Sequence, residues 1–60
     1  MKLITLTRHD GQHIVVNADK IEMLIPYEGC TAVIFDGGHG TDVRETDKEI
    51  IEKIRKEDAR

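Results

Sequence analysis

Residues 2–16 read KLITLTRHDGQHIVV, and this stretch decides how the chain folds. Residues 2–8 are rich in β-branched side chains, and Ile4 and Leu6 alternate with Leu3, Thr5 and Thr7, which is typical of a β-strand; residues 13–16 form the predicted partner strand. Between these segments stands Asp10-Gly11, a strong short-range hairpin signal because both residues tolerate a positive φ. We therefore predict an antiparallel hairpin, in which Ile14 and Val16 share one face.

The following segments predict three more short strands, separated by turns. Asn17-Ala18-Asp19 turns the chain, since Asn and Asp side chains can bond their own backbone. Pro26 is expected to end the pairing of the strand before it, because proline has no N–H for a ladder. The predicted strands cover residues 21–25, 31–35 and 41–44.

The last segment changes to a helical period. Thr46 and Glu49 match a capping box, in which the hydroxyl caps the helix and the glutamate reaches back. Ile50, Ile51 and Ile54 form the predicted apolar stripe, and residues 55–60 are expected to fray. The predicted fold is a single α+β domain over residues 1–60. It is a small, barrel-like antiparallel β-meander of about five short strands with one C-terminal helix.

The size of the chain predicts self-association. A domain of 60 residues supplies a core worth no more than about 3–5 kcal/mol. Cys30 is the single cysteine, so disulfides cannot add to it. One short helix also cannot cover both faces of a sheet. We expect a homodimer or a larger homo-oligomer.

Charge and hydropathy indicate the compartment. The net charge of −3 argues against nucleic acid, whose backbone is bound by clustered Lys and Arg. A lone cysteine fits a reducing cytoplasm. The N-terminal residues MKLITLTRHD are too short and too polar for a signal peptide. No apolar run is long enough for membrane insertion. We expect a soluble, cytoplasmic protein.

The polar motifs favour structure over catalysis. FDGGHG at 35–40 is rich in glycine, as a phosphate-binding loop is. However, the segment that follows it has a strand pattern, and it does not contain the Gly-Lys-Ser/Thr of such a loop. We interpret it as a turn between strands. The carboxylates Asp36, Asp42, Glu45 and Asp47 are close in sequence, yet so short a chain has little room for a water-excluding pocket. We interpret them as solvated and helix-capping acids.

Metal and thiol chemistry are also not predicted. Zinc needs four converging ligands, and the spacing of His9, His13, His39 and Cys30 does not promise them. Cys30 has no evident base to lower its pKa. We predict no enzyme, no catalytic residue, no metal and no cofactor.

Arg8 and Arg44 are the candidate contact residues for a ligand or partner. One ends the first predicted strand and the other ends the last. If those strands are neighbours, the two guanidinium groups come close together, an arrangement suited to phosphate or carboxylate. The alternative is two solvent-exposed strand ends near acidic residues.

The order of these motifs resembles the FlbD family of small flagellar and swarming-motility proteins. The resemblance covers almost the whole chain and is carried by Leu6-Thr7-Arg8, Asp10-Gly11, Val16-Asn17-Ala18-Asp19, Ile21-Glu22, Thr31-Ala32-Val33 and residues 43–50. It implies a non-enzymatic cytoplasmic accessory protein that is associated with flagellar motor power or assembly. Flagellar motor proteins are then the implied partners.

A second resemblance gives an alternative function. The carbon storage regulators, which are small RNA-binding dimers, also carry a Leu-Thr-Arg opening like residues 6–8 and a Val-x-Arg segment near Val43-Arg44. In this chain the arginine follows the valine directly, and the segment from Asn17 to Glu22 fits that family poorly. RNA would be the partner in this alternative. An accessory protein of a phage or mobile element is a further possibility.

Overall fold

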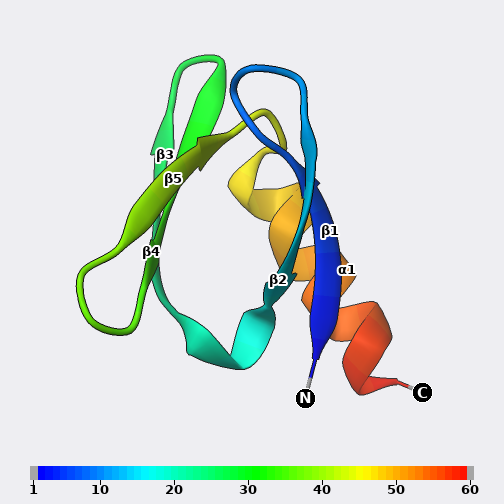
Figure 1. The fold of residues 1–60 in the computed structure, drawn as a ribbon. Helices are drawn as coiled ribbons and strands as arrows, with labels where there is room; N and C mark the ends of the chain where they lie inside the picture. The colour runs from blue at the N-terminus through cyan, green and yellow to red at the C-terminus, as the bar shows by residue number, and fades with distance from the viewer. Residues whose placement is uncertain (1, 60) are drawn as a thin grey trace.

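The first two strands form the hairpin that their sequence predicts. The structure, a computed structural model, describes residues 2–59 (Figure 1). β1 (Leu3–Thr7) pairs antiparallel with β2 (His13–Asn17), so that Leu6 faces Ile14 across the ladder. Ile4 and Leu6 are buried, whereas Leu3 and Thr5 between them are exposed. The alternation of β1 therefore points one face of the hairpin into the core.

The loop between β1 and β2 differs from the predicted Asp-Gly turn, because only its glycine adopts a positive φ. Gly11 has a φ of +93°, but none of the described non-glycine residues, Asp10 included, has a positive φ. The Arg8 N–H donates to the Gln12 carbonyl at 2.7 Å, and the Gly11 N–H donates to the Arg8 carbonyl at 2.8 Å. This pattern is that of a three-residue loop, in which a turn is followed by one left-handed residue.

The remaining strands form a second sheet. A short 3-10 helix, η1 (Ala18–Lys20), leads into β3 (Ile21–Tyr27), which pairs with β4 (Cys30–Phe35). β5 (Gly40–Val43) pairs with β4 on its other side, so the order is β3-β4-β5.

The expectation that Pro26 ends the pairing of its strand is wrong. Pro26 lies opposite Thr31 inside the ladder, and β3 continues to Tyr27. β3 is an edge strand, and a proline on such a strand can turn its nitrogen to the open side without losing a ladder bond.

Residues 7–9 and 42–45 join the two sheets at one end. Arg8 and Val43 form an isolated antiparallel bridge. The His9 N–H donates to the Asp42 carbonyl at 2.9 Å, and the Arg44 N–H donates to the Thr7 carbonyl at 2.8 Å. The α+β fold with five antiparallel strands and a C-terminal helix is confirmed, but the strands form two sheets and do not close into a barrel.

α1 (Asp47–Asp58) begins at the predicted capping box. The Glu49 N–H donates to Thr46 Oγ1 at 3.1 Å, and the Thr46 N–H donates to Glu49 Oε1 at 3.0 Å. Ile50 is fully buried and Ile54 half-buried, whereas the side chain of Ile51 is 45% exposed. The apolar stripe is therefore narrower than predicted.

α1 also continues further than its apolar stripe. The helix runs through Asp58, into the stretch 55–60 that we expected to fray. Lys2 Nζ forms an ion pair with the Asp58 carboxylate, which ties this end of the helix to the start of β1. Residue 60 lies outside the described residues.

The core lies between the two sheets and α1. Its buried members come from β1, η1, β4, β5 and α1, namely Ile4, Leu6, Ala18, Val33, Val43 and Ile50. Half-buried apolar side chains, among them Ile14, Val16, Leu24 and Phe35, pack around them. α1 contacts both β1 and β3, so the helix covers the gap between the two sheets on one side (Figure 1).

Leu6→Ala should lower the free energy of unfolding by about 2–5 kcal/mol, because it opens a cavity in the buried cluster that Leu6 shares with Val43 and Ile50. Leu3→Ala is the matched control, since Leu3 lies on the same strand but is exposed, and surface changes cost about 0.5 kcal/mol or less. Urea unfolding followed by circular dichroism measures both. Equal losses in the two variants would contradict this placement of the core.

Candidate interaction surfaces

Glu45 lies beside the end of β1 and takes the place of a neighbouring strand. Its two carboxylate oxygens accept the Thr7 N–H at 2.8 and 3.0 Å. The Glu45 carbonyl accepts the hydroxyl of Thr31, a buried side chain, at 2.8 Å. The residues that follow β5 therefore satisfy polar groups from both sheets at the start of the helix.

The hydrogen bonds to Glu45 change its titration. Partial burial would by itself raise the pKa of the Glu45 carboxyl, but the bonds from the Thr7 N–H favour the charged form, and the pKa is lowered from its usual 4.5. A lowered pKa in the folded state means that the ionised carboxylate stabilises the fold above about pH 4.5. This contribution is lost as the pH falls through the lowered pKa.

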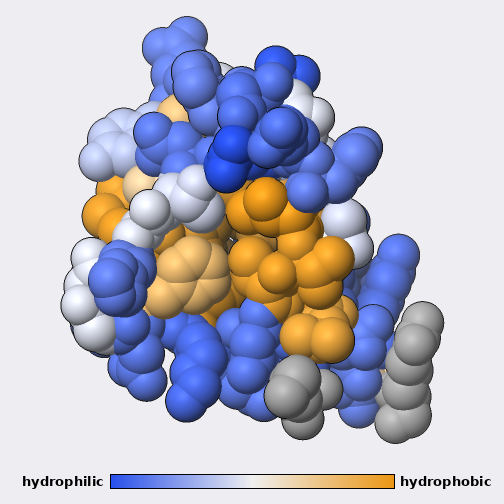
Figure 2. Space-filling view, in the orientation of Figure 1, coloured by the Kyte–Doolittle hydropathy of each residue, from blue (hydrophilic) through white to orange (hydrophobic). Residues whose placement is uncertain are grey.

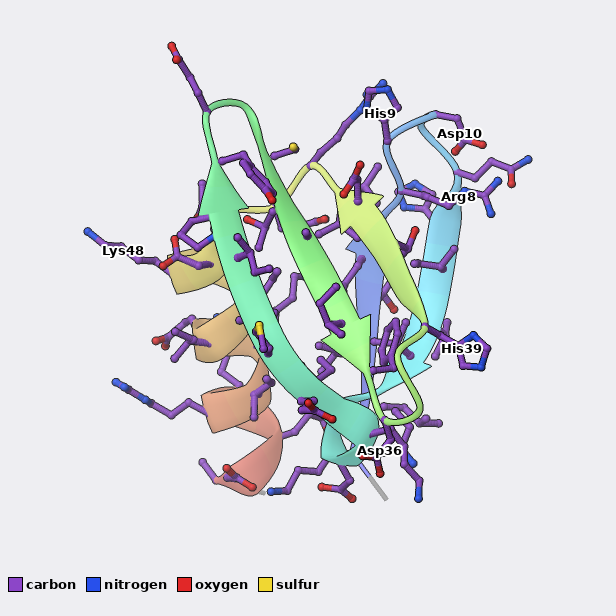
Figure 3. The ribbon with its side chains drawn as sticks, turned by 90° about the vertical axis from the view of Figure 1, so that its left-hand side faces the viewer. Arg8, His9, Asp10, Asp36, His39 and Lys48 are labelled. Atoms are coloured by element: carbon purple, nitrogen blue, oxygen red, sulfur yellow. The ribbon has the colours of Figure 1, made fainter. Side chains whose placement is uncertain are left out.

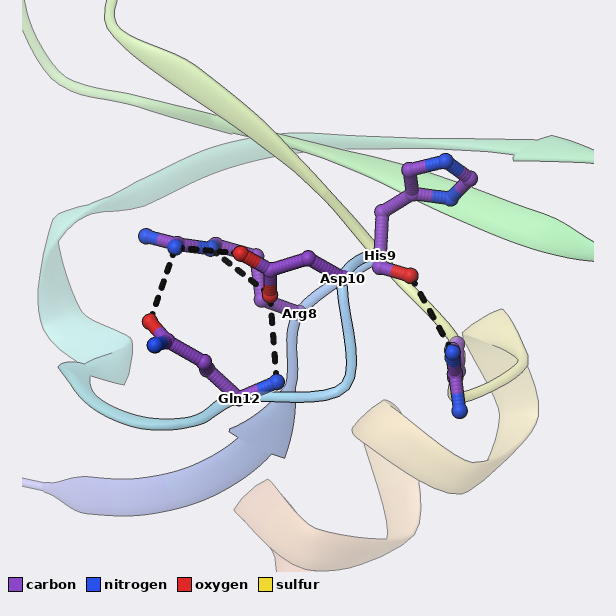
Figure 4. Close-up of polar contacts among 5 residues, drawn as sticks. Arg8, His9, Asp10 and Gln12 are labelled. Carbon is purple, nitrogen blue, oxygen red and sulfur yellow. Dashed lines mark hydrogen bonds and ion pairs between the residues drawn. The ribbon is translucent and has the colours of Figure 1, made fainter.

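The structure places both candidate arginines at the loop between β1 and β2, but their guanidinium groups have different partners. Arg8 and its partners are labelled in Figure 4. The Arg8 guanidinium contacts Asp10 at 2.6 and 3.2 Å and Gln12 Oε1 at 2.9 Å. Arg44 Nη2 donates to the His9 carbonyl at 3.3 Å and lies next to Gly11.

The Arg8–Asp10 pair is the strongest electrostatic feature of this loop. The hydrogen bond from Arg8, followed by that from the Gln12 N–H, lowers the pKa of Asp10 to about 2. Arg8 is thus neutralised by a carboxylate of its own loop. Contact of Arg8 or Arg44 with a ligand stays a prediction.

The other motifs that we examined for chemistry lie far from one another. Phe35 to Gly40 forms the predicted turn: the Phe35 N–H donates to the His39 carbonyl at 2.6 Å, and Gly37 and Gly38 have positive φ. His9 lies at the β1–β2 loop, whereas His39 lies in this turn (Figure 3). Within residues 2–59 no group of three His, Cys, Asp or Glu side chains is placed to hold a metal ion.

The candidate carboxylates are likewise dispersed. Asp36 lies in the turn after β4 and Asp42 on β5, whereas Glu45 binds Thr7 and Asp47 begins α1. A shallow groove between β1 and α1 is lined by Leu3, Ile4, Thr5, Lys53, Lys56 and Glu57. None of the four candidate acids borders this groove. These carboxylates are close in sequence, but they do not form an acid–base pair in the groove.

A feature that motif analysis missed is the apolar outer side of the β3–β4–β5 sheet, which we call the outer sheet face. Leu24 and Val33 point to the core, so their neighbours along each strand point outward. The outward residues pair across the ladder as Met23 with Ile34, Ile25 with Ala32 and Tyr27 with Cys30.

The outer sheet face is most exposed at Met23 and Tyr27, whereas Ile25, Ile34 and Cys30 are half-buried and Ala32 is buried. Figure 3 looks onto the β3–β4–β5 sheet, with the β1–β2 hairpin behind it and α1 to one side. Met23 is 47% exposed and Tyr27 59%. Acidic residues border the apolar pairs, since Asp42 lies opposite Ala32 on β5 and Glu28 lies in the exposed turn beyond Tyr27. The available signal was the consecutive apolar residues of 23–25 and 32–35, since successive side chains of a strand point to opposite faces and such a run makes both faces apolar.

Comparison with protein families identifies the group to which this chain is related. Residues 3–60 match the model of FlbD, described as flagellar and swarming motility proteins. The chain belongs to the FlbD family. Neither the curated proteins nor the solved structures gave a match. In this FlbD chain, no helix within residues 2–59 is long and apolar enough to cross a membrane.

The residues that carry the FlbD resemblance mostly build the fold. Leu6 is buried in the core, and Asn17 accepts the Asp19 N–H at the start of η1. Thr46 and Glu49 form the capping box of α1. The FlbD pattern therefore explains how the two sheets and the helix assemble. Met23, Tyr27 and Ile34 of the outer sheet face lie outside the segments that carry the resemblance.

Glu45→Gln should lower the free energy of unfolding by about 1 kcal/mol at pH 7, because a neutral amide is a weaker acceptor for the Thr7 N–H. As the pH falls through the lowered pKa of Glu45, the difference between the variant and the parent should shrink, since the carboxyl becomes protonated in the parent. Urea unfolding over a series of acidic pH values measures it. Glu28→Gln in the exposed turn is the control, and a loss for Glu45→Gln that stays constant over the whole series would contradict the role of its charge.

Proposed function

We propose that this chain is a non-enzymatic, cytoplasmic accessory protein of flagellar or swarming motility, which acts by binding a protein partner. The observation that carries the proposal is the match of residues 3–60 to the family of flagellar and swarming motility proteins. The dispersal of its titratable groups supports binding over catalysis, because acid–base chemistry needs groups within hydrogen-bond reach of one reacting atom.

The outer sheet face is the surface that we assign to the partner. It presents paired apolar side chains on a rigid sheet, and Met23 and Tyr27 are of types that are enriched at protein interfaces. Asp42 and Glu28 border it, and the whole chain carries a net charge of −3. The complementary partner has an apolar surface bordered by Lys or Arg. Flagellar motor proteins are the class in which we would look for it.

Met23→Glu should abolish or strongly reduce motility, because it places a charge in one of the three apolar pairs of the outer sheet face. Ile51→Glu is a matched control: the two side chains are 47% and 45% exposed, but Ile51 lies on α1. The measurement is swarm expansion of a deletion strain that expresses the parent or either variant, after circular dichroism has shown that both variants fold.

Three results of the swarming experiment would count against the proposal. A deletion strain that swarms normally would contradict the role in motility. Normal swarming with Met23→Glu would contradict the assignment of the outer sheet face. Equal defects with Met23→Glu and Ile51→Glu would show that added negative charge, and not the position of the residue, disturbs function.

RNA binding is the second candidate, because the fold brings Arg8 and Arg44 to one loop. The Arg8–Asp10 ion pair opposes it, since Asp10 already occupies the guanidinium and would repel phosphate. We expect no binding to a GGA-containing hairpin RNA in a gel-shift assay at low salt. Binding that weakens with salt and is lost in Arg44→Ala would favour the regulator over the motility protein.

A further inference from the structure

We propose that β2 is a self-association strand, which pairs antiparallel with β2 of a second copy about a two-fold axis at Val15. β2 pairs with β1 on one side, and no strand of residues 2–59 pairs with its other side. In Figure 3, β2 stands at the margin of the molecule, on the far side from α1. The free side of β2 therefore presents an unpaired backbone edge.

The hydrogen-bond pattern identifies the groups on this edge. The Arg8 N–H donates to the Gln12 carbonyl, and the Ala18 N–H donates to the Lys2 carbonyl, so residues 12 and 18 turn toward the β1 side. Residues along an antiparallel strand alternate in this respect. The N–H and C=O groups of His13, Val15 and Asn17 consequently point away from β1.

The edge of β2 lacks the features that protect edge strands. Its sequence HIVVN has no Lys, Arg, Asp, Glu or Pro, which are the residues that normally prevent edge-to-edge pairing. β3, by contrast, carries Glu22 and Pro26. The open side of β1 is occupied at Thr7 by the Glu45 carboxylate, and β5 uses its Asp42 carbonyl to bind His9.

Pairing about Val15 is self-complementary, which is why the occupant is a second copy. Val15 would lie opposite Val15 of the second copy, Ile14 opposite Val16, and His13 opposite Asn17. In each pair, apolar side chains lie opposite apolar ones and polar side chains opposite polar ones, and no two like charges face each other. Other two-fold registers can also pair the outward backbone N–H and C=O groups, but each leaves some residues of β2 without a partner. The register centred on Val15 pairs all five residues of β2.

The surface next to this edge supplies apolar area for the contact. Val15 is 64% exposed, and Ile14, Val16 and Phe35 are half-buried at the rim of the core. Figure 2 shows hydrophobic surface over β1 and β2 on the side opposite α1. A standard interface takes about 800 Å² from each partner, which is a large share of the 4267 Å² of this chain. The dimer therefore needs this surface as well as the strand edge.

Sedimentation of charge variants tests the proposal. The parent should show a concentration-dependent dimer. Val15→Lys and Val15→Glu should each raise the dissociation constant by about tenfold or more, since like charges would meet at the axis. An equimolar mixture of the two variants should recover the dimer. Ile51→Lys is the control, because Ile51 is also an exposed apolar side chain but lies on α1, on the far side of the molecule from β2.

Three outcomes would overturn the proposal. They are a parent that stays monomeric at every concentration, a Val15→Lys variant that dimerises like the parent, and a mixture of the Lys and Glu variants that stays monomeric. If either Val15 variant fails to fold, hydrogen exchange of the parent decides instead. Exchange of the Val15 amide should then slow with protein concentration, and an exchange rate that is independent of concentration would overturn the proposal.

Discussion

The joint between residues 7–9 and 42–45 is the constraint on which the rest of the structure depends. It holds together a two-stranded hairpin and a three-stranded sheet that would otherwise be separate, through the Arg8–Val43 bridge and the bonds of Thr7 to Arg44 and Glu45. Because Thr46 caps α1 immediately after these residues, the same joint also fixes where the helix begins relative to the core. A hairpin alone is marginally stable in water, so the sheets and the helix depend on one another.

Within residues 2–59, this construction leaves apolar side chains of both sheets exposed, among them Val15, Met23 and Tyr27. α1 covers the gap between β1 and β3, but a single short helix does not reach the outer sheet face or the free edge of β2. The two surfaces differ in chemistry. The outer sheet face is bordered by Asp42 and Glu28, which suits a different partner, whereas β2 is uncharged and self-complementary. The proposed protein partner and the proposed second copy would therefore contact different sheets.

Local signals were sufficient to predict most elements of the fold. The capping box at Thr46, the turn at Phe35–Gly40 and the alternation of Ile4 and Leu6 depend on near neighbours in the sequence, and all three are confirmed. Pro26 and Ile51 show the limit of local patterns. Whether a strand can contain a proline depends on which side of that strand is unpaired. Whether an isoleucine is buried depends on which side of the helix packs against the sheets.

The sequence by itself determined the α+β class, the hairpins and their turns, the start of the helix and the family, because these follow from residue type and spacing along the chain. The tertiary structure alone decided that the strands form two joined sheets, that Arg8 is neutralised by Asp10, and that Met23 and Val15 face solvent. Such features are set by contacts between residues distant in the chain. Periodicity indicates that a side chain lies on one face of a strand, but only the packed neighbours decide whether that face is covered.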